Sequence, residues 1–111
     1  MDDYDIYELF IEKYYIGIYS INKKLETGQM AFTYDIIQKF KYELRNISEE
    51  IRNILHMAYL LGIVESINES NNNLTFINLF RFYYEKVNKD NIPVEIKIFL
   101  YKEKNIYKYL N

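Results

Sequence analysis

Apolar residues recur every three or four positions through residues 3–26. The members of this stripe are Tyr4, Tyr7, Ile11, Tyr14, Ile18, Ile21 and Leu25. Because residues three and four apart lie on the same face of an α-helix, the spacing predicts one long N-terminal helix that ends near Gly28. Gly17 and the strand-like composition of YYIGIYSI argue against this helix, but the seven positions in register outweigh them.

Two interpretations of this stripe remain open. It can be the core-facing side of the helix, which is the commoner case, or a seam between two copies of the chain. A strict 3–4 repeat is narrower than most core faces, and a chain of 111 residues does not need so long a buried helix. We therefore predict a homodimer with the stripe at least partly in its interface.

The middle of the chain predicts two further helices. Residues 33–45 place apolar residues at helical spacing behind Thr33, which is a suitable cap. Residues 49–61 follow Ser48 as a second cap, and acidic residues occupy the first turn, where the helix dipole is positive. The apolar stripe of this second helix comprises Ile51, Ile54, Leu55, Ala58 and Leu61.

A β-hairpin is predicted after Gly62, which suits the end of a helix. Two apolar runs, over residues 63–67 and 74–79, are separated by NESNNN, a stretch rich in turn-forming residues. The predicted fold class is therefore α+β and mainly α, with one hairpin and a long N-terminal helix.

The C-terminal third has a mixed pattern. NLFRFYYEKV fits a helix through Phe80, Tyr83 and Val87, and Asn91-Ile92-Pro93 predicts a break before a new element. Residues 93–109 alternate like a strand as far as Leu100 but also fit a helix, and we favour the helix.

Composition limits the classes of protein that this chain can belong to. Its length of 111 residues predicts one domain, residues 1–111, and its 50% apolar and 27% charged content is typical of a globular protein. No stretch has the length and apolarity of a membrane span, and no signal sequence is present. We therefore expect an intracellular protein.

Catalysis finds little support in the sequence. The chain has no cysteine and a single histidine, His56, which lies beside an apolar stripe and is more often structural than a base. No nucleophile–base set, phosphate-binding glycine loop or metal-ligand motif is present. We predict a non-enzymatic protein without a metal or cofactor.

The segment ISEEIRNILHMAYLLGIVESI carries a resemblance to a known family. Its helix ends in Leu60, Leu61, Gly62, Ile63 and Val64. With the elements on either side, residues 33–79 resemble the winged-helix superfamily, in which a recognition helix is followed by a hairpin, the wing. In size and in its bias toward Tyr, Ile and Asn, the chain also resembles small uncharacterised proteins of viruses that infect hyperthermophilic archaea. Together these resemblances imply a viral transcription regulator, located in the host cytoplasm.

The winged-helix resemblance implies a nucleic-acid surface on the helix over residues 49–61. The residues that would face the major groove are Arg52, Asn53 and His56, with Arg45 just before the helix. Arginine and asparagine are suited to reading guanine and adenine edges. Two features depart from the family: Glu49 and Glu50 lie where phosphates would approach, and the wing contains acids but no Lys or Arg, which makes it a poor phosphate clamp.

The C-terminus is a second candidate for nucleic-acid binding, in a chain whose net charge is −2. Its bases are Lys97, Lys102, Lys104 and Lys108, and aromatic residues are interleaved with them. Aromatic rings beside cations are typical of single-strand binding. The commoner alternative is an amphipathic helix whose tyrosines pack inward.

Two functions therefore remain open. One is a dimeric, non-enzymatic regulator that binds DNA or RNA, and the other is a protein-interaction or assembly protein. The position of the positive charge discriminates them: Arg45, Arg52 and the C-terminal lysines on one face would favour nucleic acid, and scattered charges would favour a protein partner.

Overall fold

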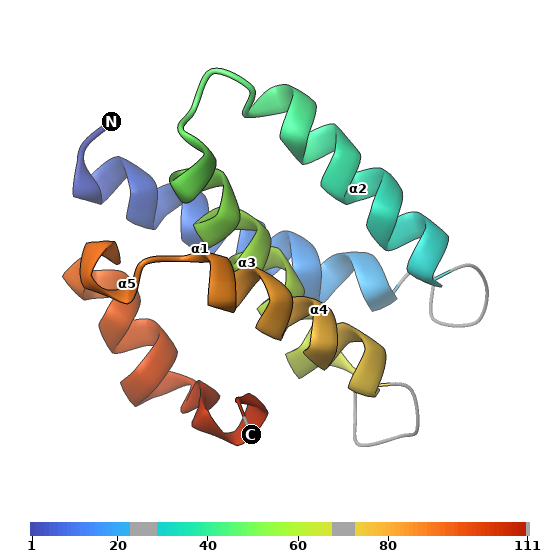
Figure 1. Ribbon diagram of the computed structural model, residues 1–111. Coiled ribbons are helices and arrows are strands. Elements are labelled where there is room, and N and C mark those ends of the chain that lie inside the picture. The colour runs from blue at the N-terminus through green and yellow to red at the C-terminus, as the bar shows by residue number, and fades with distance from the viewer. Residues whose placement is uncertain (23–28, 68–72, 111) are drawn as a thin grey trace.

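The computed structural model describes residues 1–22, 29–67 and 73–110, which form helices and short helical turns. In chain order these are α1 (Asp3–Asn22), α2 (Gln29–Glu43), α3 (Glu49–Ser66), α4 (Asn73–Lys86), the 3-10 turn η1 (Lys89–Asn91), α5 (Val94–Lys97), the π-helical turn η2 (Ile98–Glu103) and the 3-10 turn η3 (Ile106–Tyr109). None of the described residues lies in a β-strand, so the fold is all-α over these ranges (Figure 1).

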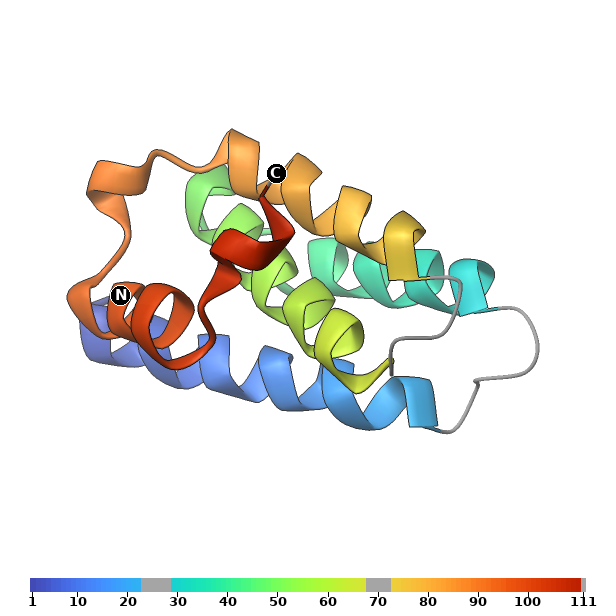
Figure 2. The same cartoon turned by 90° about the horizontal axis from the view of Figure 1, so that it is seen from below.

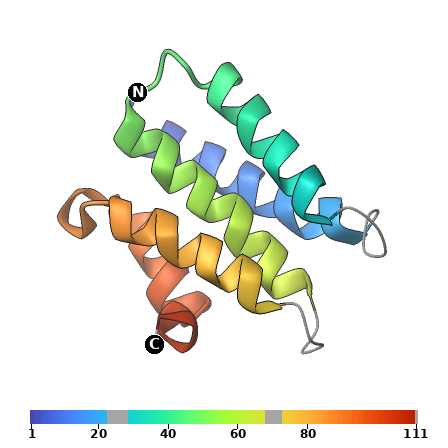
Figure 3. The same ribbon diagram turned by 45° about the vertical axis from the view of Figure 1, so that its right-hand side comes forward.

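The central element is α3, which has neighbours on every side. Twelve consecutive residues, from Asn53 to Val64, are buried. Helix α1 packs along one side of α3 and α4 along another, and α2 flanks the first half of α3 (Figure 3). A helix that is apolar all round is expected to be buried, so α3 forms the axis of the hydrophobic core.

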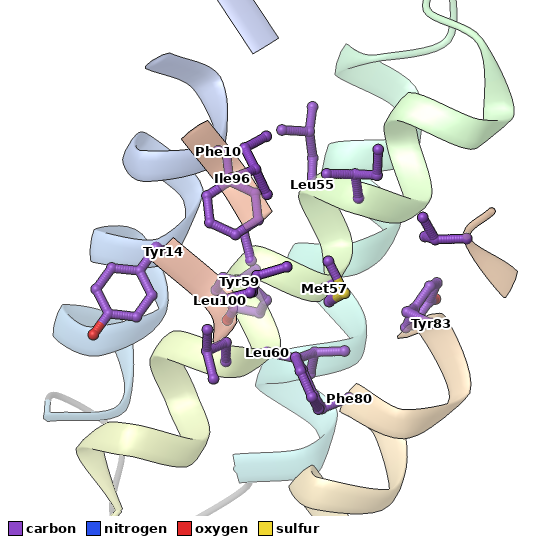
Figure 4. Packing of buried hydrophobic residues seen from close by; sticks show 14 of the residues in the cluster. Phe10, Tyr14, Leu55, Met57, Tyr59, Leu60, Phe80, Tyr83, Ile96 and Leu100 are labelled. Atoms are coloured by element: carbon purple, nitrogen blue, oxygen red, sulfur yellow. The ribbon is translucent and has the colours of Figure 1, made fainter. Parts of the chain in front are cut away.

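The rest of the core joins α3 to the other helices. Phe10 of α1 and Ile96 of α5 lie on one side of α3, and Phe80 and Tyr83 of α4 lie on another (Figure 4). The C-terminal segment crosses the open side between α1 and α4 (Figure 2). There the Phe99 ring meets the Phe10 ring edge-on, with 5.5 Å between their centroids.

A pair of glycines sets how closely α1 and α3 approach. A Cβ atom on Gly17 would lie 2.1 Å from the carbonyl oxygen of Tyr59, and one on Gly62 would lie 2.1 Å from that of Tyr14. Backbone oxygens cannot move aside as side chains do, so only glycine fits at this crossing. Gly17, which argued against a helix in the sequence, is therefore the residue that lets α1 pack on α3.

The predicted α+β fold with a β-hairpin is wrong. Residues 63–67 were expected in the first strand, but α3 continues through Gly62 to Ser66. Residues 74–79 were expected in the second strand, but they belong to α4. The turn expected at NESNNN falls mostly on residues 68–72, which lie outside the described ranges.

Packing explains both errors. Gly62 lies inside α3 and does not end it. Its missing side chain instead makes room for the backbone of α1. The buried residues Phe76, Phe80 and Tyr83 of α4 and Val87, just after its end, are spaced 4, 3 and 4 apart. The expected strand therefore shares one helical stripe with the residues that follow it. The β-hairpin expected as the wing is therefore absent from the described residues.

The other sequence predictions fare better. Ser48 caps α3 by accepting a hydrogen bond from the Ile51 amide at 3.3 Å. The helix favoured over residues 93–109 is confirmed from Val94 to Glu103, with a change from α to π geometry at Ile98. Beyond it, Asn105 has left-handed backbone geometry and is followed by the 3-10 turn η3. Helix α2 begins at Gln29, before the Thr33 that was expected as its cap, and the predicted helix end at Gly28 lies outside the described residues.

Candidate anion-binding pocket

A pocket of about 450 Å³ lies over the first half of α3, between the C-terminal ends of α2 and α4. Figure 3 shows the two flanking helices and α3 between them. Its lining residues are Lys41, Arg45, Glu49, Arg52, Asn53, His56, Phe82, Tyr83 and Lys86. The pocket therefore combines cationic, amide, imidazole and aromatic groups from three helices and the residues that follow α2.

Positive charge dominates this pocket. Four cationic side chains, Lys41, Arg45, Arg52 and Lys86, face one carboxylate, Glu49. Within the described ranges, none of these four cations forms an ion pair with a carboxylate within 4.0 Å. A chain with a net charge of −2 thus carries a local excess of positive charge at this place.

The two arginines are held by backbone carbonyls. Arg52 donates from Nη1 to the carbonyl of Ile47 at 2.9 Å, and more weakly to those of Leu44 and Arg45 at 3.5 and 3.4 Å. These carbonyls follow the end of α2, where a helix leaves acceptors unpaired. Arg45 donates to the Tyr42 carbonyl at 2.8 Å and lies 4.3 Å from the centroid of the Tyr42 ring. The Arg52 guanidinium is therefore held by several carbonyls and that of the exposed Arg45 by one, and both still have further N–H donors.

The α4 side of the pocket combines a lysine with an exposed aromatic ring. Lys86 Nζ lies 4.4 Å from the centroid of the Phe82 ring and 5.9 Å from that of Tyr83. Phe82 is 52% exposed, which is unusual for phenylalanine and leaves ring surface available at the rim. The cation and the aromatic surface thus lie next to each other at the entrance.

His56 forms part of the pocket floor and is only 1% exposed. Its ring lies edge-on to Tyr83, with 5.0 Å between centroids, and parallel to Phe40 at 6.5 Å. Neither Nδ1 nor Nε2 has a hydrogen-bond partner among the described residues. Burial, with smaller contributions from Lys41, Arg52 and Lys86, lowers the pKa of His56 to about 4. At neutral pH the imidazole is therefore uncharged, with one N–H donor and one acceptor nitrogen.

The structure brings four of the predicted site residues together in this pocket, namely Arg45, Arg52, Asn53 and His56. It does not place them on an exposed recognition face, because α2 and α4 flank α3 and leave Asn53 8% and His56 1% exposed. The acidic pair expected to oppose phosphates lies close by: Glu49 lines the pocket, and Glu50 accepts a hydrogen bond from Asn91 at 3.2 Å.

Sequence reasoning missed Lys41, Lys86 and Phe82. The available signal was helical spacing, since Lys41 lies four residues before Arg45 and Phe82 four residues before Lys86. Residues at that spacing share a helix face, so each pair was predictable locally. The pattern could not show that the two faces meet across α3.

The C-terminal lysines lie elsewhere in the molecule. Lys104 Nζ is 3.6 Å from Glu65 Oε1, near the end of α3, and 5.0 Å from the centroid of the Tyr14 ring. Glu65 is thirteen residues beyond Arg52 along α3, or roughly 20 Å. Of the remaining C-terminal lysines, Lys97 is half-buried and Lys102 and Lys108 are exposed.

The aromatic residues interleaved with these lysines pack partly inward. Phe99 is buried against α1, and the Tyr101 hydroxyl lies 2.7 Å from that of Tyr84. Burial and this hydrogen bond raise the pKa of Tyr101. Tyr107 is exposed and stacks on Tyr101, with 5.2 Å between ring centroids. One side of the segment therefore packs inward, as expected for an amphipathic helix, and the other side exposes an aromatic ring.

The apolar stripe predicted on α1 lies beside the buried face of that helix. The residues of α1 that face the core are Ile6, Phe10, Lys13, Tyr14 and Gly17. On an ideal helix the centre of the predicted stripe lies roughly 80° around from the centre of this face. Tyr14 is accordingly buried, Tyr7, Ile11 and Ile18 are half-buried, and Tyr4 is 68% exposed. The Ile21 side chain and Leu25 lie outside what the structure describes.

The described residues also bear on two other kinds of site, a membrane span and a metal centre. None of their helices is both long enough and apolar enough to span a membrane. The same residues contain no group of three or more His, Cys, Asp or Glu side chains that could hold a metal ion. Comparisons with protein families, with curated proteins and with solved structures find nothing that matches this chain.

Proposed function

We propose that this chain is a non-enzymatic nucleic-acid-binding protein and that the pocket between α2 and α4 is where it binds phosphate. The observation that carries the proposal is the convergence of Lys41, Arg45, Arg52 and Lys86 around one hollow without an ion-paired carboxylate among the described residues. Nucleic-acid backbones are bound chiefly by such uncompensated cations. An intracellular location goes with this proposal.

The number of cations sets the expected strength of binding. If all four contact phosphates, the slope of log affinity against log salt is roughly −3 on a single strand and roughly −4 on a duplex. Glu49 lies in the same pocket and opposes a second phosphate there. Binding should therefore be modest and should weaken steeply as salt rises.

A salt-dependent titration with single-stranded DNA, duplex DNA and RNA tests the proposal. Lys41→Gln should weaken binding and reduce the salt slope by about 1, as loss of one phosphate contact does. Lys39→Gln is the matched control, because Lys39 is exposed on the same helix but lies roughly 200° around it from Lys41. Absence of binding to all three nucleic acids at low salt, or equal effects of the two substitutions, would refute the proposal.

A homodimer formed through α1 is part of the same proposal. The exposed side of the stripe, with Tyr4, Tyr7 and Ile11, forms a shallow surface together with Glu8 and Glu12. Half-buried and exposed apolar residues at the edge of a helix suit an isologous contact with a second copy. Two copies would present two basic pockets, and a linked pair of weak sites binds one strand more tightly than either site alone.

A protein partner is the second candidate function. The observation that favours it is the separation of the C-terminal lysines from the basic pocket, since Lys104 pairs with Glu65 near the far end of α3. The exposed pair Tyr15 and Tyr19, whose rings stack at 6.2 Å, adds aromatic surface of the kind found in protein interfaces. A chain that binds no nucleic acid in the titration above would favour this function.

A further inference from the structure

The geometry of the basic pocket points to a specific ligand: we propose that it binds the phosphorylated end of a single nucleic-acid strand. This inference rests on the proposed nucleic-acid function and deepens it, by assigning the pocket to a terminal phosphate monoester and its nucleotide. Three features of the pocket support it: its charge, its depth and the neutral and aromatic groups beside the cations.

The charge of the pocket fits a terminal phosphate better than an internal one. A phosphodiester inside a strand carries one negative charge, whereas a phosphate monoester carries about −1.5 to −2 at neutral pH. The pocket offers four cations against one carboxylate within about 450 Å³. Lys41 and Lys86 approach from opposite walls, and the guanidinium groups of Arg45 and Arg52 already donate to backbone carbonyls. Fixed donors around one hollow suit one doubly charged group.

The depth of the pocket favours a strand end. Its floor is α3, where Asn53 and His56 are almost fully buried, and its walls are α2 and α4. A duplex presents its phosphates along convex ridges, so it would contact the rim but not this floor. A free strand end can enter between the walls, because its last nucleotide is not paired or stacked on both sides.

The groups beside the cations suit a nucleotide more than a bare phosphate. Phe82 exposes half of its surface at the rim, next to Lys86, and aromatic rings in such positions stack on bases. His56 has two ring nitrogens without a partner among the described residues. Both nitrogens are covered in this structure, so a sugar hydroxyl or a base edge would reach them once neighbouring side chains at the pocket floor shift. Since burial keeps the imidazole neutral, the cations are left for the phosphate.

The acidic neighbours limit how much of the strand can lie in the pocket. Glu49 lines the pocket, and it also lines a neighbouring depression together with Glu50. Two carboxylates on that side repel a further phosphate. The site is therefore complete for one terminal phosphate and unfavourable for a run of backbone phosphates, which distinguishes it from a general strand-binding groove.

The test compares one fluorescent single-stranded oligonucleotide in three forms: with a 5′-phosphate, with a 3′-phosphate and with both ends as hydroxyls. We expect one of the phosphorylated forms to bind at least tenfold more tightly than the hydroxyl form. Lys41→Gln and Lys86→Gln should each reduce this ratio severalfold, whereas Lys39→Gln should leave it unchanged. Both pocket lysines are exposed, so these variants should fold normally, and circular dichroism checks that they do.

His56→Phe gives an independent measurement at the floor of the pocket. It keeps an aromatic ring beside Phe40 and Tyr83 but removes both ring nitrogens. We expect severalfold weaker binding of the preferred phosphorylated form with no loss of thermal stability. Unchanged affinity would overturn the role assigned to His56.

The outcomes separate this inference from the proposed function. Equal affinity for the phosphorylated and hydroxyl forms would overturn the terminal-phosphate site, while the salt-dependent binding itself would still support a nucleic-acid-binding protein. Failure of all three forms to bind would overturn both. A phosphate preference that survives Lys41→Gln and Lys86→Gln would also overturn the inference, because it would place the terminal phosphate elsewhere.

Discussion

Replacing His56 by phenylalanine should change how the stability of this protein depends on pH. His56 is 1% exposed, and its ring nitrogens have no partner among the described residues. The charged groups that lower its pKa are positive: Lys41 on α2, Arg52 on α3 and Lys86 on α4. Lys13 of α1 lies against the neighbouring Phe40 ring, and the carboxylate that lines the same pocket is Glu49. These cations add to the effect of burial, which is the main reason that protonation of the imidazole is disfavoured.

The magnitude follows from the difference in pKa between the unfolded and folded chains. The His56 pKa falls from 6.5 to about 4 on folding, mainly because of burial. Between these values the unfolded chain binds a proton that the folded chain does not, so stability decreases as pH falls from 6.5 and levels off below about 4. This linkage lowers the free energy of unfolding by about 2 kcal/mol between pH 7 and pH 5.

The variant should behave differently at both pH values. At pH 7, His56→Phe should raise the free energy of unfolding by about 1 kcal/mol, because it removes a buried polar group without a protein partner. At pH 5 the gain should grow to about 3 kcal/mol, since the linkage is also lost. His56→Leu, which is closer in volume to histidine, serves as a second variant if the phenylalanine ring does not fit.

Urea denaturation of both proteins at pH 7 and pH 5 measures these free energies. The difference between the variant and the original chain isolates His56, because every other titrating group is common to both. Since the chain has one histidine, its imidazole proton resonances also give the folded pKa directly. Parallel pH dependence of the two proteins, or a measured pKa near 6.5, would refute the reasoning.

Three further predictions concern the fold and assembly. Gly62→Ala should destabilise the chain by about 1–3 kcal/mol in urea denaturation, although alanine normally stabilises a helix, because its Cβ would meet the Tyr14 carbonyl at 2.1 Å; a gain in stability would contradict the close crossing. Tyr14→Phe removes the 2.5 Å hydrogen bond to Glu65 and should lower the free energy of unfolding by about 1–2 kcal/mol in the same assay. An unchanged free energy of unfolding would show that the bond is not formed in solution. Ile11→Asp should convert the proposed dimer to a folded monomer, as measured by the mass from light scattering. A monomeric mass for the original chain would refute the dimer, and unfolding of the variant would assign Ile11 to the core.

The helical parts of this fold were largely predictable from sequence periodicity. Spacing of three and four predicted α1, α2 and α3, and the cap at Ser48 marked the start of α3. The errors arose at residues with two possible roles. Gly62 can end a helix or allow close packing within one, and only the position of Gly17 on the opposite helix decides between them. That information is tertiary and is absent from local spacing.

The same limit applies to the pocket. The resemblance to winged-helix proteins selected Arg45, Arg52, Asn53 and His56, which do lie together, but it implied an exposed helix face. Their actual position depends on α2 and α4 flanking α3, which leaves Asn53 and His56 buried. Spacing along single helices could not predict the pocket, because its charges come from three different helices.

Among the described residues, His56 is a buried polar side chain that departs from the requirements of stability. Its neighbours in the buried run of α3, such as Leu55, Met57 and Leu60, are apolar and fully buried, and an apolar residue at position 56 would avoid the cost of a buried imidazole without a protein partner. Local departures from good core packing tend to coincide with functional sites, where activity rather than stability fixes the residue. His56 is such a departure, and it lies on the floor of a pocket that also gathers four cations without ion pairs among the described residues. The buried imidazole without a protein partner and the excess positive charge thus occur at the same place, and the proposed ligand site would account for both.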